Sequence, residues 1–363
     1  KNKMILKLYQ SYIIKKFLLT IFNVSFVFFG LVIIMSLFEE ISFFSEIDVS
    51  IYFPVILVLL NSFSVLYQLF PFIFLIGIQF FFINFIDSGE FNAFKNYGLS
   101  NIKILKVIAL TSFISGIIIV TLFYNFAAIL KFKYIDLKNT YSNDSRYLAS
   151  VTENGLWIKD EHNEQIYFIS AEKISLNKLH NIEVMILDDK FSLAKKIFST
   201  EANISKNEWL MKDVIITNKI GKTSKTNNYV FYSNFNYQKI NNLYSDLSSL
   251  TFLGLLKLYK DYQIINYSVT DLDIHITSLY AYPFFLTVLT VLSSIIMINI
   301  RHQKPKIFYI SGGIIFSVIV YYISFFFTAL GKNEQIPSML SIWLPIFLLL
   351  ILSLIGIIKL NEK

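Results

Sequence analysis

Six long apolar runs dominate the chain, three before a polar middle region and three after it. The runs cover 17–38, 51–86, 104–126, 274–300, 307–330 and 339–358. A run of about 20 apolar residues crosses the hydrocarbon core of a bilayer once as a helix. The pattern predicts an α-helical membrane bundle of six transmembrane helices.

The run 51–86 is too long for one straight crossing. A helix over these residues would extend about 54 Å, against a hydrocarbon core of about 30 Å. Pro71 lies inside the run, and an interior proline loses a hydrogen bond and clashes with the preceding turn. We therefore expect a break near Pro71, with 51–67 as a helix at the outer surface and 68–86 as the second span. Two full spans in this run are the alternative, which conflicts with the positive-inside bias.

The distribution of basic residues predicts the sidedness of the chain. Lysines precede the first run. The loop around 39–48 contains acidic residues and no Lys or Arg. Basic residues also occur in the turn between the fourth and fifth runs and at the C-terminus. These basic residues are Lys1, Lys3, Lys7, Lys15, Lys16, Arg301, Lys304, Lys306, Lys359 and Lys363. Because short cytoplasmic segments are enriched in Lys and Arg, we expect both termini in the cytoplasm of a six-pass protein.

The middle region, 131–266, contains short segments of alternating apolar and polar residues. Segments with this pattern are 155–159, 165–169, 182–187, 191–198, 209–216 and 229–232, with turn sequences at 188–190 and 205–208. Many short strands without intervening helices predict a sandwich or jelly roll. The expected division is therefore a membrane half at 1–130, an all-β domain outside the membrane at 131–266 and a second membrane half at 267–363.

A polar island at 87–100 separates the second and third spans on the predicted cytoplasmic side. It contains Glu90, followed by Phe91, Phe94 and Tyr97 at helical spacing. Such spacing suits an amphipathic helix that docks in a groove of another protein. The island is interpreted as a helix that binds a soluble partner, although a solvated loop acid is the plain alternative for Glu90.

Composition and charge narrow the function further. Hydrophobic residues make up 55% of the 363 residues, far more than in a soluble domain. The net charge of +7 comes from dispersed lysines rather than an Arg-rich face, which argues against nucleic-acid binding. The absence of cysteine excludes disulfides, thiol nucleophiles and thiolate metal sites.

No catalytic pattern stands out. Asp271, Asp273 and His275 are possible metal ligands, but Thr270 and Asp273 have the spacing of a helix capping box, and we expect no metal here. The remaining histidines are expected to be solvated, and no catalytic triad or phosphate loop occurs. The spans carry almost no ionisable residues, so ion-coupled transport lacks a binding site. We expect a non-enzymatic chain that takes energy from elsewhere.

Several motifs resemble those of the LptF/LptG permease family. The island, D-S-G-E at 87–90 through G-L-S at 98–100, resembles the family's cytoplasmic segment. The sequence G-L-W-I-K-D at 155–160 is similar to the opening of the LptG β domain. The C-terminal Gly331, Ile336-Pro337 and Trp343-Leu-Pro345 are similar to the family's ending.

This resemblance implies a bacterial inner-membrane permease of an ATP-driven lipopolysaccharide exporter, with a periplasmic β-jelly roll. It implies four kinds of partner: an LptF-like second permease, an LptB-like ATPase dimer that binds ATP and Mg, and LptC- and LptA-like periplasmic proteins. It also implies an ATPase-docking set at the island, with no cofactor on this chain. The set comprises Asp87, Glu90, Phe91, Ala93, Phe94, Tyr97 and Gly98.

The sequence departs from the family where the lipid head group is expected. Many relatives carry basic residues at the outer end of the first span, which corresponds here to Ser36, Ser42 and Phe43. Glu39 and Glu40 make this neighbourhood acidic. Relatives also often carry a lysine where Leu279 stands, four residues before Pro283. Ser36, Glu39, Glu40 and Ser42 are kept as the candidate head-group region.

Two other classes of function compete with transport. A membrane-anchored scaffold would use the β domain to bind partners without moving lipid. A membrane glycosyltransferase would need acids or arginines clustered at the outer ends of spans. Only the acids at 39–48 qualify, and no metal or base partner faces them.

Overall fold

The computed structural model describes residues 8–45, 49–50, 52–139, 156–162, 165–175, 177–187, 193–219, 221–237, 240, 246–264, 268–299 and 306–361. By its internal contacts the chain forms two compact units, Lys1–Lys131 with Thr270–Lys363, and Phe132–Val269. Several sequence expectations lie outside the described residues. These are the lysines at 1–7, the acids Glu46 and Asp48, Gly155, the turn 188–190 and the basic residues Arg301, Lys304 and Lys363.

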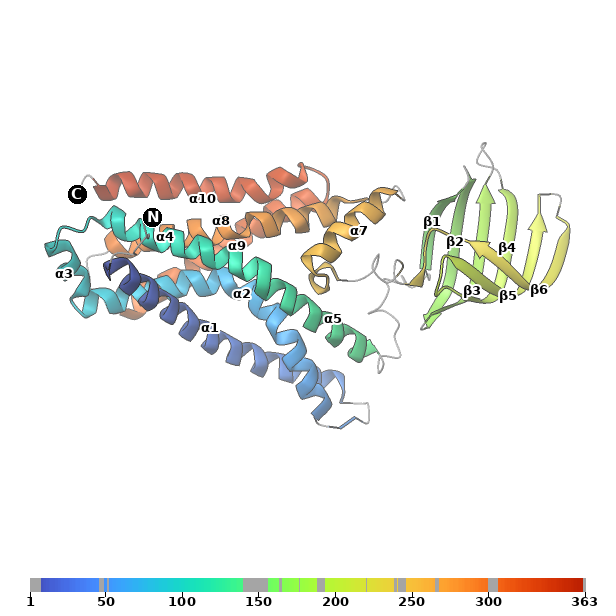
Figure 1. Ribbon diagram of the computed structural model, residues 1–363, viewed down its shortest axis with the longest axis horizontal. Helices are drawn as coiled ribbons and strands as arrows, with labels where there is room; N and C mark the ends of the chain where they lie inside the picture. Colours follow the sequence, from blue (N-terminus) through green and yellow to red (C-terminus); the bar gives the residue numbers. More distant parts are fainter. Residues whose placement is uncertain are drawn as a thin grey trace, which may run out of the picture. The chain divides into compact units, whose positions relative to one another are not determined.

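The first unit is helical (Figure 1). Its helices are α1 (Leu8–Phe43), α2 (Tyr52–Asp87), α3 (Glu90–Asn96), α4 (Asn101–Ile118), α8 (Thr270–Asn299), α9 (Lys306–Lys332) and α10 (Ser338–Asn361). A π-helical turn, η1 (Ile119–Tyr124), joins α4 to α5 (Asn125–Asn139), so that one helical rod runs from Asn101 to Lys138. Within the described residues, six helices are long and apolar enough to cross a membrane, as predicted.

The predicted break near Pro71 is wrong. Helix α2 runs through Pro71 without ending, and Figure 1 shows it bending along its length instead. The proline lacks the N–H that would bond the carbonyl of Tyr67, four residues earlier. The hydroxyl of Tyr282 on α8 donates to that carbonyl at 2.9 Å. A neighbouring helix thus satisfies the exposed backbone group, which is how membrane helices tolerate interior prolines.

Small and polar residues bring α4 and α8 close together. A Cβ atom on Gly116 would lie 2.7 Å from the Cα of Pro283, so glycine is needed for this approach. Nearby, the buried hydroxyls of Ser112 and Thr290 are 3.0 Å apart and hydrogen-bonded. Close backbone approach and interhelical hydrogen bonds hold helices together where burial from water cannot.

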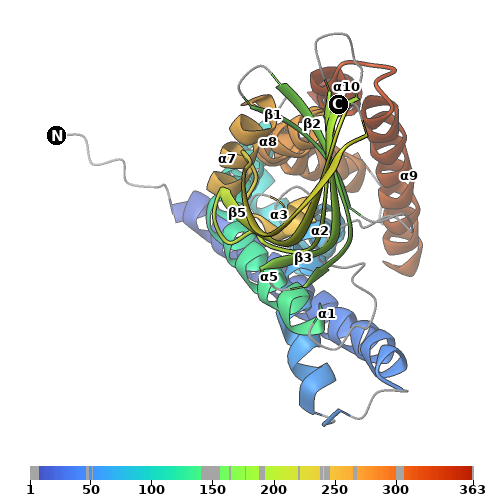
Figure 2. The same cartoon turned by 90° about the vertical axis from the view of Figure 1, so that its right-hand side faces the viewer.

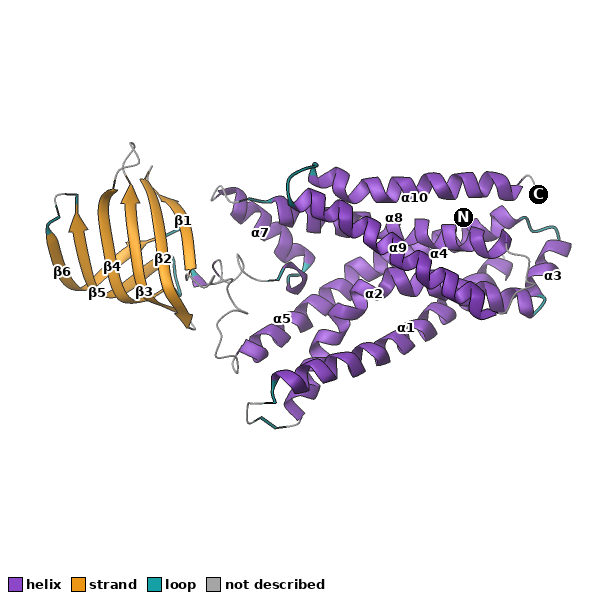
Figure 3. Ribbon diagram, turned by 180° about the vertical axis from the view of Figure 1, so that it is seen from behind, coloured by secondary structure: helices purple, strands orange, loops and turns teal. Residues whose placement is uncertain are grey.

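The second unit contains one antiparallel sheet, coloured orange in Figure 3. Its six strands follow each other in sequence order, so the predicted all-β domain is confirmed and the described strands connect as a meander. The strands are β1 (Leu156–His162), β2 (Gln165–Ser175), β3 (Lys178–Leu187), β4 (Leu193–Asn203), β5 (Glu208–Asn218) and β6 (Thr223–Tyr232). Helix α7 (Phe252–Ile264) follows the sheet in sequence.

Strands β3, β4 and β5 share an irregular position, here called the crease, at Asn181, Thr200 and Asp213. Asn181 and Asp213 both have φ of 50°, and the ladders between β3, β4 and β5 are interrupted beside these residues. The alternation of buried residues changes phase there, from Leu179 to Ile182 and from Met211 to Val214. Figure 2 shows the strands curving into a U. One sheet therefore folds over its own core, which includes the fully buried Trp209.

Asp160 holds the folded sheet closed. Its carboxylate is 1% exposed and accepts hydrogen bonds from the hydroxyl of Ser233 at 2.6 Å and from the backbone and side-chain N–H groups of Asn234, each at 3.0 Å. Asp160 lies on β1, whereas Ser233 follows β6, so the two edge strands of the meander are joined. The final aspartate of the G-L-W-I-K-D motif thus has a structural role.

Candidate functional site

The polar island folds into the short helix α3 because glycines bound it on both sides. Gly89 before the helix has φ of 74° and Gly98 after it has φ of 80°, a region that residues with side chains rarely adopt. The N–H of Leu99 bonds the carbonyl of Phe94 and the N–H of Gly98 bonds that of Lys95. This pairing is a Schellman motif, which ends the helix and turns the chain into α4.

The aromatic residues of the island divide between two roles. Phe91 is 8% exposed and packs edge-on against Phe82 and Phe85 of α2, so it anchors α3 to its own chain. Tyr97 is 86% exposed and free of such packing. Phe94 is half-buried, between Tyr12 and Phe85. Ala93 and Asp87 are exposed.

Glu90, the first residue of α3, forms an ion pair with Lys16 of α1. The Oε2 and Nζ atoms are 2.5 Å apart. Partial burial alone would raise the pKa of Glu90, but hydrogen bonds from Lys16 and Tyr12 and the charge of Lys16 outweigh it, so the pKa is lowered. The Glu90 carboxylate is therefore ionised at neutral pH and is not a simple solvated loop acid.

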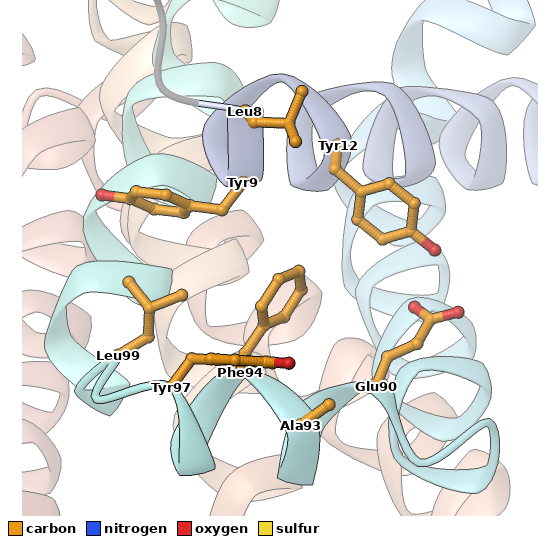
Figure 4. Close-up of a pocket in the computed structure, with 8 residues that line it drawn as sticks. All are labelled: Leu8, Tyr9, Tyr12, Glu90, Ala93, Phe94, Tyr97 and Leu99. Carbon is orange, nitrogen blue, oxygen red and sulfur yellow. The ribbon is translucent and has the colours of Figure 1, made fainter.

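An apolar pocket of about 620 Å³ opens between the start of α1 and α3 (Figure 4). Leu8, Tyr9 and Tyr12 form one wall. The facing wall comes from α3 and the residues after it. The residues of this second wall are Glu90, Ala93, Phe94, Tyr97 and Leu99. An apolar concavity with an acid at its rim suits an apolar side chain with a neighbouring basic group on another protein.

The structure gathers most of the predicted docking residues at this pocket. Glu90, Ala93, Phe94 and Tyr97 line it, while Gly98 shapes the turn and Phe91 lies behind it. The residues that α1 contributes to the pocket were not predicted from the sequence. Tyr9, Tyr12 and Lys16 lie three and four residues apart, a spacing that places them on one helix face, and this spacing was the available signal.

The candidate head-group residues lie near the end of α1 and differ in burial. Ser36 and Glu40 are buried on one face of the last turns of α1, and Glu39 and Ser42 are exposed on another. Leu279 is 1% exposed inside the bundle. Two of the four candidate residues are thus buried within the chain and two are exposed.

The start of α8 contacts neighbouring segments of the chain. Thr270 is the first residue of α8, and its hydroxyl donates to Glu334 Oε1 at 3.0 Å. His275 Nε2 lies 3.0 Å from the hydroxyl of Tyr124, which the π-helical turn carries. Among the residues that the structure describes, no group of three or more His, Asp or Glu side chains is placed to hold a metal ion.

Comparison with protein-family models matches residues 11–359 to the family described as lipopolysaccharide export system permease LptF/LptG. The match spans nearly the whole chain, so the chain belongs to this family, and the resemblance indicated by its motifs is confirmed. The family model covers both LptF and LptG. A search of curated proteins found no match.

Proposed function

We propose that this member of the LptF/LptG family is the non-catalytic membrane subunit of an ATP-driven exporter that extracts lipopolysaccharide from the inner membrane. Membership of the family supports a permease role in lipopolysaccharide export, and six apolar helices support its location in the inner membrane. The ATP, with Mg, would bind to a separate LptB-like ATPase dimer. A second, LptF-like permease would complete the lipid path.

One observation carries the proposed coupling to the ATPase. The island forms a compact helix that presents an ionised carboxylate beside an apolar pocket. A partner with a basic and apolar surface finds both complements there, and helix docking of this kind gives specific attachment. Tyr97, the exposed aromatic residue directly after α3, is the strongest candidate for a contact residue.

The β domain is proposed to lie in the periplasm and to pass lipopolysaccharide to LptC- and LptA-like proteins. Within the part of the chain that the structure describes, the edge strand β6 is paired with β5 alone, and an edge of this kind is a template for a strand of another protein. The G-L-W-I-K-D motif supports an LptG-type subunit. Both termini would then lie in the cytoplasm.

The decisive experiment co-expresses the chain with the second permease and the ATPase. Reversing the charge with Glu90→Lys should abolish co-purification of the ATPase, because like charges would then face its basic surface. Exposed Glu208→Lys on the β domain is the charge-matched control and should leave co-purification intact. Full ATPase recovery with Glu90→Lys would refute docking at α3.

A lipid crosslinking assay separates a transporter from a scaffold. A photoreactive group placed inside the bundle should crosslink to lipopolysaccharide in proteoliposomes, and ATP should change the yield. An ATP-independent yield, with all partners present, would favour a scaffold that binds partners without moving lipid.

A further inference from the structure

The ion pair between Lys16 and Glu90 joins the docking helix to the first membrane span. The two residues are 74 positions apart in sequence, on α1 and α3. Their side chains are 23% and 30% exposed, so neither is fully hidden from a partner. A charge-assisted hydrogen bond of this length is stronger and more directional than a neutral one.

Aromatic rings fix the position of the Lys16 ammonium group. Its Nζ atom lies 5.8 Å from the ring centre of Tyr12 on α1 and 5.5 Å from that of Phe85 near the end of α2. Cations are attracted to ring faces at such distances. Lys16 therefore contacts three helices at once, and its place is set by packing as well as by Glu90.

The ion pair lies at one end of the pocket. Figure 4 shows Tyr12 and Glu90 close together at one end, whereas Tyr9, Tyr97 and Leu99 surround the other end. Tyr12 also packs on Phe94, with ring centres 6.0 Å apart. The start of α1 and helix α3 thus form two walls that are fastened to each other at the Glu90 end.

The helices that flank α3 differ in how firmly they are held. In the most apolar stretch of α1, 17% of residues are buried within the chain, against 67% for α2. A helix with fewer buried contacts moves at lower cost. The ion pair therefore links α3 to the less enclosed of these two helices, in addition to the packing of Phe91 on α2.

We infer that Lys16 is a positioning residue that holds Glu90 and so transmits movement of the docked ATPase to the first span. This inference rests on the proposed docking role of α3. Without the ion pair, the ATPase would still bind α3 through the pocket and Tyr97, but α3 would keep only neutral contacts to α1, namely the hydrogen bond from Tyr12 to Glu90 and the packing of Tyr12 on Phe94. Hydrolysis would then be uncoupled from lipid release.

The test compares Lys16→Met, Lys16→Arg and the neighbouring Lys15→Met in the complete complex, reconstituted in proteoliposomes with lipopolysaccharide. Lys16→Met should retain the ATPase but transfer roughly three- to tenfold less lipid per ATP hydrolysed, the effect of losing one charge-assisted hydrogen bond. Lys16→Arg should restore most of this ratio because it keeps the cation. Lys15→Met removes an equal charge from an exposed site and should leave the ratio unchanged.

A distance measurement on the full chain checks the positioning directly. The chain has no cysteine, so Ser11→Cys and Asn92→Cys, both at exposed sites outside the pocket, give a defined pair of spin labels on α1 and α3. Lys16→Met should broaden the distribution of distances between them, and Lys15→Met should not. If Lys16→Met does not accumulate, Lys16→Gln provides the same loss of charge with a smaller change in polarity.

The possible failures are distinct. If Lys16→Met matches Lys15→Met in both coupling ratio and label distances, while Glu90→Lys still loses the ATPase, the positioning role is overturned and docking stands. If Glu90→Lys keeps the ATPase, the docking role fails and the role of Lys16 fails with it.

Discussion

In each of the two units a carboxylate connects segments that are far apart in sequence, but the two carboxylates differ in burial and in the charge of their donors. Glu90 in the membrane unit and Asp160 in the β domain each bridge segments 74 residues apart. Asp160 is almost completely buried and accepts three hydrogen bonds from neutral donors. Glu90 is 30% exposed at its side chain and accepts from a lysine.

The comparison shows that burial decides how much the hydrogen bonds of a carboxylate contribute to stability. A buried carboxylate that loses its donors has no water to replace them, so its contacts persist as long as the fold does. A partly exposed ion pair adds little to the free energy of unfolding, because water solvates both partners when the chain unfolds, although in the folded chain the pair still fixes the positions of the two side chains. Glu90 is therefore suited to contact a partner, whereas Asp160 is suited to close the sheet.

We expect the largest effect on stability from removing the Asp160 carboxylate. Asp160→Ala should destabilise the closed sheet by at least about 3 kcal/mol, because the donors of Ser233 and Asn234 would be left without an acceptor. Faster hydrogen exchange of β1 and β6 amides in the full chain would report the opening. The exposed Glu208→Ala should change exchange by less than about 0.5 kcal/mol. Equal exchange in both variants would show that Asp160 does not hold the sheet.

A neutral hydrogen bond inside the bundle gives an intermediate case. Tyr282→Phe removes the donor to the Tyr67 carbonyl and should cost about 1 kcal/mol. In a Pro71→Ala background, residue 71 regains an N–H that can bond the same carbonyl, so Tyr282→Phe should then cost almost nothing. A double-mutant cycle, measured by unfolding of the full chain in detergent, gives the coupling. Additive costs would contradict this account of the bend.

The smallest effect concerns the pH dependence of the Glu90 pair. Because the pKa of Glu90 is lowered below its usual value of 4.5, the stability it contributes is present above that value and is lost as pH falls through the lowered pKa. Glu90→Gln should therefore cost a constant amount, under about 1 kcal/mol, between about pH 6 and pH 8. Unfolding at several pH values checks this. A cost that fades between pH 8 and pH 6 would show that the pair is not ionised as described.

Much of the architecture was accessible from sequence because it depends on local patterns. Runs of apolar residues identify membrane helices, since every backbone polar group in lipid must be bonded within a helix or closed barrel. Alternation identified all six strand regions, although several strands extend beyond the predicted bounds, as in β2 and β3. Helical spacing after Glu90 identified Phe94 and Tyr97, which line the pocket beside it.

Other features required contacts between distant residues. The bend of α2 was predicted as a break because the donor that rescues Tyr67 is 215 positions away on α8. The crease in the sheet depends on Asn181, Thr200 and Asp213 aligning across three strands, and no single strand shows it. The partner of Glu90 is a lysine that the sequence assigned only to sidedness.

The order of apolar and polar segments by itself determined six membrane helices, a strand-rich middle and an amphipathic segment with an acid, because hydrophobic burial and backbone hydrogen bonding act within each segment. Only the tertiary structure decided that Lys16 holds Glu90, that Tyr282 carries α2 past Pro71 and that Asp160 closes the sheet. Each of these contacts depends on the direction of side chains from elements far apart in sequence, which local patterns do not contain.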